Sequence, residues 1–180
     1  MKNKNPDQLE KEAKAAFKKG NFVDAQKIFF DAEQSYLANG DNLAAAEMAN
    51  NRGVALLQAG DAITALEVVD GTDETFAEAG DTRRQALAIG NKAAALEELG
   101  SLEEAAEAYE TSANLLKEIG ESDLRASVMQ SLSAVQLKQG LQLQSLATMK
   151  SGLESIKHPN PKQRVVKKLL QVPFSFFDRK

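Results

Sequence analysis

Catalysis needs side chains that transfer protons or attack as nucleophiles, and this sequence has few of the usual kinds. It contains no cysteine and one histidine, His158, which stands next to Pro159 in a proline-rich segment. These counts exclude the common Ser–His and Cys–His arrangements of nucleophilic enzymes. We interpret His158 as a linker residue and expect no catalytic residues in the chain.

Carboxylates are numerous, but their placement does not favour chemistry. One acidic group falls on the exposed side of an expected helix: Glu103, Glu104, Glu107 and Glu110. Paired carboxylates act as acid and base only in a water-poor cleft, so a solvated helix face is the better interpretation. The acidic pair Asp70 and Asp73 lacks the further clustered ligands that a cation site needs. We therefore predict no enzyme activity, no cofactor and no metal site.

Amide and hydroxyl side chains form a more regular pattern. Asn51, Asn91 and Ser131 stand at intervals of forty residues. An Asn amide donates and accepts at once, so a row of such residues can pair with the N–H and C=O groups of a partner's backbone. The alternative is that Asn51 and Asn91 cap or brace neighbouring helices.

The elements that would position these residues follow a period of twenty residues. Seven glycines mark it: Gly20, Gly40, Gly60, Gly80, Gly100, Gly120 and Gly140. Between them, apolar residues recur every three or four positions, as on one face of an α-helix. A glycine suits the left-handed residue that ends a helix, and the next residue suits an N-cap in five cases. These N-cap candidates are Asn21, Asp41, Asp61, Asp81 and Ser101, and Ser101 forms a capping-box pattern with Glu104.

Two such helices joined by a short turn must lie antiparallel, so the repeating unit is a hairpin of about forty residues. We predict four hairpins, at about residues 6–40, 41–80, 81–120 and 121–157, followed by a basic, aromatic segment at 158–180. A single hairpin cannot cover its apolar face, and the hairpins must therefore stack into an all-α solenoid.

One of the expected helices contains a weak point. The second helix of the second hairpin begins at Ala62 and meets the run Asp70-Gly71-Thr72-Asp73. A glycine inside a helix costs about 1 kcal/mol relative to alanine. We interpret this run as a kink or a tolerated defect, and the alternative is a hinge that changes the curvature of the array.

Residues at fixed places in the hairpins resemble the tetratricopeptide repeat, in its longer variety of about forty residues. The first hairpin carries the signature in Ala13, Gly20, Phe22, Ala25 and Phe29, and the third in Ala93, Gly100, Leu102, Ala105 and Tyr109. The second hairpin matches in part and the fourth is degenerate, and the resemblance covers roughly residues 6–157. The resemblance implies a right-handed superhelical solenoid. Such a fold by itself indicates little about function.

The resemblance also implies a concave groove, lined by the first helix of each hairpin, that binds an extended peptide or a partner's helix. The implied groove positions are Lys14, Asn50, Asn51, Val54, Leu57, Asn91, Ala94, Gln130, Ser131 and Leu137. One subtype of the family binds the C-terminal carboxylates of heat-shock chaperones. Its matching positions here are Glu10, Lys14, Asn51, Leu87 and Asn91. Only Asn51 agrees and Glu10 would repel a carboxylate, so this binding mode is disfavoured. We expect a non-catalytic protein-binding module or scaffold.

The last segment differs from the repeats in composition. Residues 158–180 carry a net charge of +5, while the whole chain carries −4, so the body is acidic. Its apolar residues are Val165, Val166, Leu169, Leu170, Phe174, Phe176 and Phe177. We expect the helical part to cap the last hairpin and the phenylalanines to reach further, against this chain or a second copy, as in a homodimer. The alternative function is a conformational regulator, whose tail occupies its own groove or a second subunit until a partner displaces it.

The overall composition bears on partner and compartment. The net charge of −4 argues against nucleic-acid binding by the body of the protein. The N-terminus lacks the apolar core of a signal peptide, and no apolar run approaches membrane-spanning length. We therefore expect a cytoplasmic protein without stable membrane insertion, whose partner is a protein or a peptide.

Overall fold

The structure is a computed structural model that describes residues 5–156, 159 and 161–170. Within these residues all the regular secondary structure is helical. The helices are α1 (Pro6–Lys18), α2 (Phe22–Ala38), α3 (Asn42–Gln58), α4 (Ala62–Val69), α5 (Thr72–Glu78), α6 (Thr82–Glu98), α7 (Leu102–Glu118), α8 (Ser122–Lys138), α9 (Gln142–Ser155) and α10 (Pro161–Leu170). None of the helices in the described part of the chain combines the length and the apolar character needed to cross a membrane.

Helix ends follow the glycine period of the sequence. All seven glycines on that grid have a positive φ, between +70° and +85°, which confirms the predicted left-handed residues. In the turn after α2, for example, the N–H of Asp41 bonds the carbonyl of Tyr36 at 3.0 Å and satisfies a carbonyl of the last helical turn. The connections between helices are therefore only a few residues long, and adjacent helices lie against each other.

All five predicted N-cap residues stand at N-cap positions, and three of them make the capping hydrogen bond. Asp41, Asp61 and Asp81 each accept a hydrogen bond from the N–H three residues later, at 2.8–3.1 Å. Asn21 and Ser101 also stand at the N-cap positions of α2 and α7, but neither side chain accepts a hydrogen bond from its helix. Charge alone does not decide which side chain caps, because the neutral amide of Asn5 caps α1 whereas the carboxylate of Glu121 does not cap α8.

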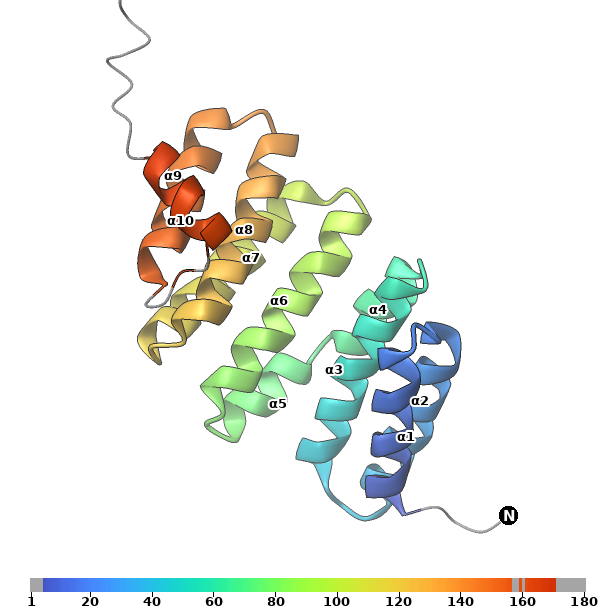
Figure 1. Cartoon of the computed structure of the whole chain (residues 1–180). Helices are drawn as coiled ribbons and strands as arrows, with labels where there is room; N and C mark the ends of the chain where they lie inside the picture. Colours follow the sequence, from blue (N-terminus) through green and yellow to red (C-terminus); the bar gives the residue numbers. More distant parts are fainter. Residues whose placement is uncertain (1–4, 157–158, 160, 171–180) are drawn as a thin grey trace, which may run out of the picture.

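The helices pack mainly against their neighbours in sequence (Figure 1). Antiparallel pairs follow one another from α1–α2 at the lower right to α8–α9 at the upper left, and α10 packs on α9. Small residues allow the close approach within a pair. A Cβ added to Gly53 of α3 would stand only 2.2 Å from Cγ1 of Val69 in α4. Any side chain there would require Val69 or one of the two helices to shift.

The expected second helix of the second hairpin is in fact two helices. α4 ends at Val69, Asp70 is extended with ψ of 132°, and Gly71 adopts φ of +76° before α5 begins. Thr72 donates its hydroxyl hydrogen to the carbonyl of Val69 at 2.7 Å and so satisfies part of the broken end. The ring of Phe76 is fully buried and holds α5 against α3 and α6. The weak run is therefore a complete break in the helix, more than a kink.

The C-terminal helix only partly follows the expected cap. α10 contacts α9, with Val166 half-buried, whereas the side chain of Val165 is 58% exposed. The backbone of Leu169 and Leu170 is helical, and their side chains lie outside the described set. The predictions for Phe174, Phe176 and Phe177 also fall outside the described residues.

Candidate functional site

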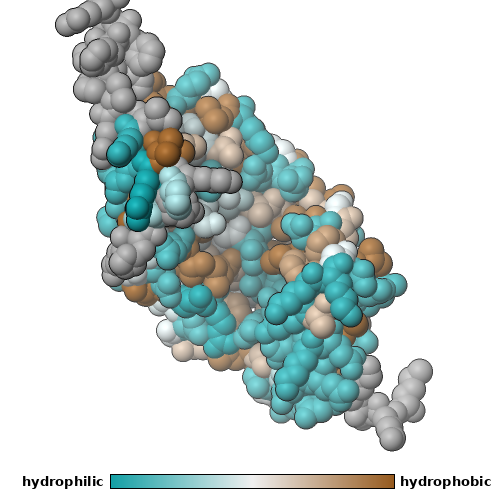
Figure 2. Space-filling view, viewed as in Figure 1, coloured by the Kyte–Doolittle hydropathy of each residue, from teal (hydrophilic) through white to brown (hydrophobic). Residues whose placement is uncertain are grey.

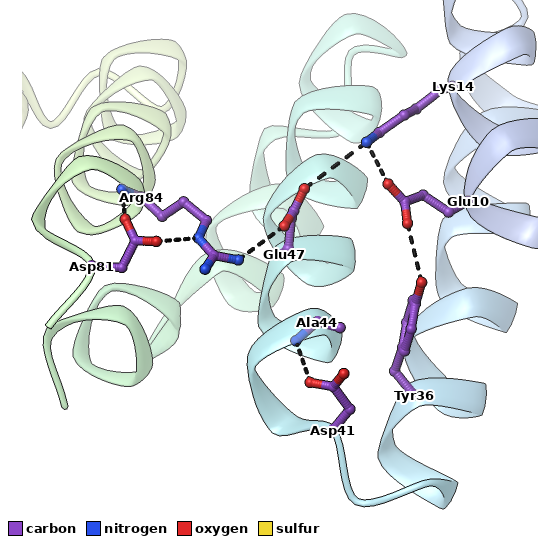
Figure 3. Close-up of polar contacts among 8 residues, drawn as sticks. All are labelled: Glu10, Lys14, Tyr36, Asp41, Ala44, Glu47, Asp81 and Arg84. Carbon is purple, nitrogen blue, oxygen red and sulfur yellow. Dashed lines mark hydrogen bonds and ion pairs between the residues drawn. The ribbon is translucent and has the colours of Figure 1, made fainter. Parts of the chain in front are cut away.

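A line of charged side chains connects the first helices of three successive pairs (Figure 3). Lys14 of α1 pairs with Glu10 and lies 3.9 Å from Glu47 of α3. Glu47 in turn pairs with Arg84 of α6 at 3.0 Å, and Arg84 pairs with Asp81 at 2.6 Å. These ion pairs are half-exposed and each contributes little to stability. Together they link α1, α3 and α6 across the surface.

The same contacts change the acidity of two groups. The pKa of the Asp81 carboxyl lies below its usual value, first because it accepts the backbone N–H of Arg84 and then because of the guanidinium. Burial raises the pKa of the Tyr36 hydroxyl, and its hydrogen bonds to Asp7 and Glu10 add to that shift. Both side chains are thus held in the protonation state that they have at neutral pH, which suits a structural role.

A small cavity of about 180 Å³ lies between α1 and α3. We call it the α1–α3 pocket, and it is lined by Lys14, Phe17, Lys18, Phe29, Asn51 and Val54. Two aromatic rings and a valine supply an apolar wall, while the two amines and the amide supply polar groups. Three of the groove residues predicted from the sequence, Lys14, Asn51 and Val54, therefore meet around one cavity.

The predicted row of amides does not form as a continuous line. Asn91 Nδ2 donates to Oδ1 of Asn50 at 3.0 Å, and Asn50 is buried. This bond joins α3 to α6, so Asn91 acts as the brace that was the alternative interpretation. Asn51, one residue further along α3, instead lines the α1–α3 pocket. Ser131 is half-buried, and its hydroxyl opposes the rise in the pKa of Tyr109, whose own hydroxyl donates to Glu97 at 3.0 Å.

The other predicted groove residues lie away from the α1–α3 pocket. Leu57 is half-buried against the cluster around Leu56, and Ala94 packs on the core between α6 and α8. Gln130 and Leu137 are exposed on α8. The structure therefore concentrates the candidate site at the N-terminal two pairs.

A second and larger cavity, of about 470 Å³, lies where α4 gives way to α5. We call it the α2–α5 groove. Its floor is formed by alanines of α3 (Ala45, Ala46 and Ala49), and its walls include Glu33 and Leu37 of α2 and Asp70, Thr72 and Glu78 at or beyond the break. The sequence prediction missed this groove, although the Asp70-Gly71 run was a signal for it.

The two cavities lie on opposite sides of α3. Successive residues of an α-helix are about 100° apart, so Ala45 and Ala49 project to one side and Asn51 and Val54 to the other. Glu33 beside the α2–α5 groove is half-buried, and desolvation raises its pKa although Arg52 pairs with it at 3.4 Å. The carboxylates of the groove are thus partly occupied by contacts within the chain, as Asp70 also pairs with Lys92 at 2.6 Å.

The hydropathy of the surface differs along the molecule (Figure 2). Hydrophilic side chains cover α1 at the lower right, while hydrophobic patches lie over the middle of the molecule.

Among the described residues, no group of three or more His, Cys, Asp or Glu side chains is arranged to hold a metal ion. Compared with protein-family models and with curated proteins, the sequence gives no match.

Proposed function

We propose that this chain is a non-catalytic binding module of the tetratricopeptide kind, a right-handed solenoid that holds a peptide or helix of a partner protein. The observation that carries the proposal is the α1–α3 pocket, because it gathers apolar and polar groups from two successive pairs at residues expected to line a groove. Pockets with an apolar wall and a few placed polar groups are typical of ligand sites.

The lining of the pocket indicates the chemistry of the bound segment. An apolar side chain of the partner would contact Phe17, Phe29 and Val54. The Asn51 amide can donate to and accept from the partner's backbone. Lys18 makes no ion pair within the described residues, and Lys14 is already paired, so Lys18 would favour an acidic residue beside the apolar one. The proposed ligand is therefore an extended segment with adjacent apolar and acidic residues.

The test starts with peptides selected from a displayed library on the full chain, whose affinities are then measured by fluorescence polarisation. Val54→Arg should weaken binding at least about tenfold, which corresponds to 1.4 kcal/mol, because it fills and charges the pocket. Ile63→Arg, at an exposed apolar residue of α4 that does not line the pocket, is the matched control and should leave affinity unchanged. Selected peptides that bind Val54→Arg as well as they bind the unchanged chain would exclude the α1–α3 pocket as the site.

Alanine variants of Asn51 and Asn91 distinguish a residue that binds the peptide from one that holds two helices together. Asn91→Ala should lower the free energy of unfolding by about 1–3 kcal/mol, since it leaves the buried Asn50 amide without its partner, and peptide affinity should not change. Asn51→Ala should do the opposite, weakening the peptide while shifting stability by no more than about 0.5 kcal/mol. Urea unfolding and fluorescence polarisation on the same two variants measure both effects, and an exchange of the two outcomes would reverse the assigned roles.

A further inference from the structure

The α2–α5 groove has an acidic rim and lies in an acidic part of the molecule. Its rim carries Glu33 and Asp70, which pair with Arg52 and Lys92, and Glu78, which forms no ion pair within the described residues. The floor is alanine, and Leu37 at the edge is 46% exposed. The segment 62–78, which forms α4, α5 and their junction, contains five carboxylates and no basic residue. In α7, the next helix of the same layer, five carboxylates accompany a single lysine. An occupant of this groove should therefore be apolar in part and positively charged.

The chain itself carries a helix of that description at its other end. α10 has four basic residues and no acidic one. Among the α10 side chains that the structure describes, the exposed ones are Pro161, Arg164, Val165 and Lys168, and their spacing places them on one stripe of the helix. Val165 thus stands between two cations on the face that turns away from α9. Within the described residues, neither Arg164 nor Lys168 forms an ion pair with a carboxylate.

The stripe cannot reach the groove of its own chain. α10 packs on α9, whereas the groove is built by α2, α3, α4 and α5 in the first two pairs, at the far end of the array (Figure 1). The stripe and the groove are complementary in charge, and each also offers an exposed apolar side chain, Val165 and Leu37.

We propose that the exposed stripe of α10 docks into the α2–α5 groove of a second copy of this chain. Val165 contacts Leu37 and the alanine floor, and Arg164 and Lys168 face Asp70 and Glu78 on the rim. Because the two surfaces are different, the contact is heterologous, and each added copy exposes a new groove and a new stripe. Assembly is therefore head-to-tail and open-ended, with an attraction that added salt screens. This contact uses the opposite side of α3 from the proposed peptide pocket and does not depend on it.

Sedimentation velocity of the full chain over a range of concentrations tests the proposal. The average mass should rise with protein concentration at low salt, and raising the salt from about 0.05 M to about 0.5 M should weaken association at least about tenfold. A chain that stays monomeric over the whole range at low salt would overturn the proposal. Association that salt does not weaken would overturn it as well.

Two variants then identify the surfaces. The stripe variant is Arg164→Glu with Lys168→Glu, and the groove variant is Leu37→Arg with Glu78→Lys. Each variant alone should be monomeric, since one component of every contact is reversed. An equal mixture should associate again, because the intact stripe meets the intact groove and the two reversed surfaces are also opposite in charge. Association of either variant alone, or no complex in the mixture, would contradict the head-to-tail contact.

Control variants test whether association depends on the groove itself, on the general charge of the protein, or on loss of folding. Glu107→Lys with Glu110→Lys on α7 alters the acidic surface outside the groove and should leave the association constant within about twofold of the unchanged chain. Circular dichroism and thermal unfolding should show that all three variants fold. If the α7 variant dissociates the assembly as strongly as the groove variant, then general charge drives association and the groove has no specific role. A groove variant that fails to fold is replaced by Glu78→Lys alone, which changes only an exposed side chain.

Discussion

The second helix of the second pair and the second helix of the third pair occupy the same place in the repeat but differ in form. Residues 102–118 form one continuous helix, α7, whereas residues 62–78 are divided into α4 and α5. Asp70 and Gly71 stand where α7 has Glu110 and Thr111, forty residues later. Because Gly71 adopts φ of +76°, the chain leaves the helix for two residues and then resumes it.

The buried hydroxyl groups of the two regions have different hydrogen-bond partners. Ser112 in the middle of α7 donates to the carbonyl of Ala86 at 2.6 Å and so ties α7 to α6. Thr72, at the equivalent place, donates to Val69 and closes the end of α4. In α7 the buried hydroxyl group bonds a neighbouring helix, whereas at the α4–α5 junction it bonds the end of the preceding helix. The break at Asp70 and Gly71 accounts for this difference. The same break opens the α2–α5 groove on that side of the molecule.

The largest difference between the regions should appear when the buried anchor of each is removed. Phe76→Ala should cost about 3–5 kcal/mol, and α5 should lose its helical structure, because a seven-residue helix cannot persist without tertiary contacts. Leu116→Ala, at the equivalent buried place in α7, should cost about 2–5 kcal/mol without local melting. Urea unfolding and amide hydrogen exchange measure the two effects. Retained protection of the α5 amides in Phe76→Ala would contradict the assignment of Phe76 as the anchor.

A smaller effect should follow from changing the break itself. Gly71→Ala should destabilise by about 1–2 kcal/mol, because an L-residue is strained at positive φ while the space around the new Cβ is open. Thr111→Ala, at the matching place in α7, should be neutral or slightly stabilising, since alanine is the better helix former. Amides at the α4–α5 junction should also exchange faster than those in the middle of α7. Equal protection in both places would remove the break as a point of local opening.

The smallest effect concerns the N-caps that begin α6 and α7. The folded-state pKa of Asp81 is lowered, so its contribution to stability is fully present above about pH 4, the usual pKa of Asp, and disappears as pH falls through the lowered folded value. Asp81→Asn should therefore lose about 1 kcal/mol at pH 7 and nothing in strong acid. Ser101→Ala should change stability by no more than about 0.5 kcal/mol at any pH, because Ser101 makes no capping bond. Thermal unfolding across acidic pH tests this, and a loss for Asp81→Asn that persists in strong acid would refute the charge-based explanation.

Local features of this protein could be predicted from its sequence because they depend on residues a few positions apart. The glycine period located the helix ends, since only the left-handed backbone at each glycine is needed to end a helix. The Asp70-Gly71 run located the break for the same reason. Carboxylate caps were also predictable, whereas Ser101 showed that a capping pattern does not guarantee the bond.

Contacts between helices were decided only by the tertiary structure. Asn50 and Asn51 are neighbours in the sequence, yet one is buried in a bond to Asn91 and the other lines a pocket. The forty-residue spacing could not show which of the two faces the neighbouring helix, because adjacent residues of a helix point about 100° apart. The outward direction of Val165 and the α2–α5 groove likewise depend on how α10 and α5 settle against their neighbours. Periodicity determines which residues can share a face, and the packing of that face against other helices determines what each residue contacts.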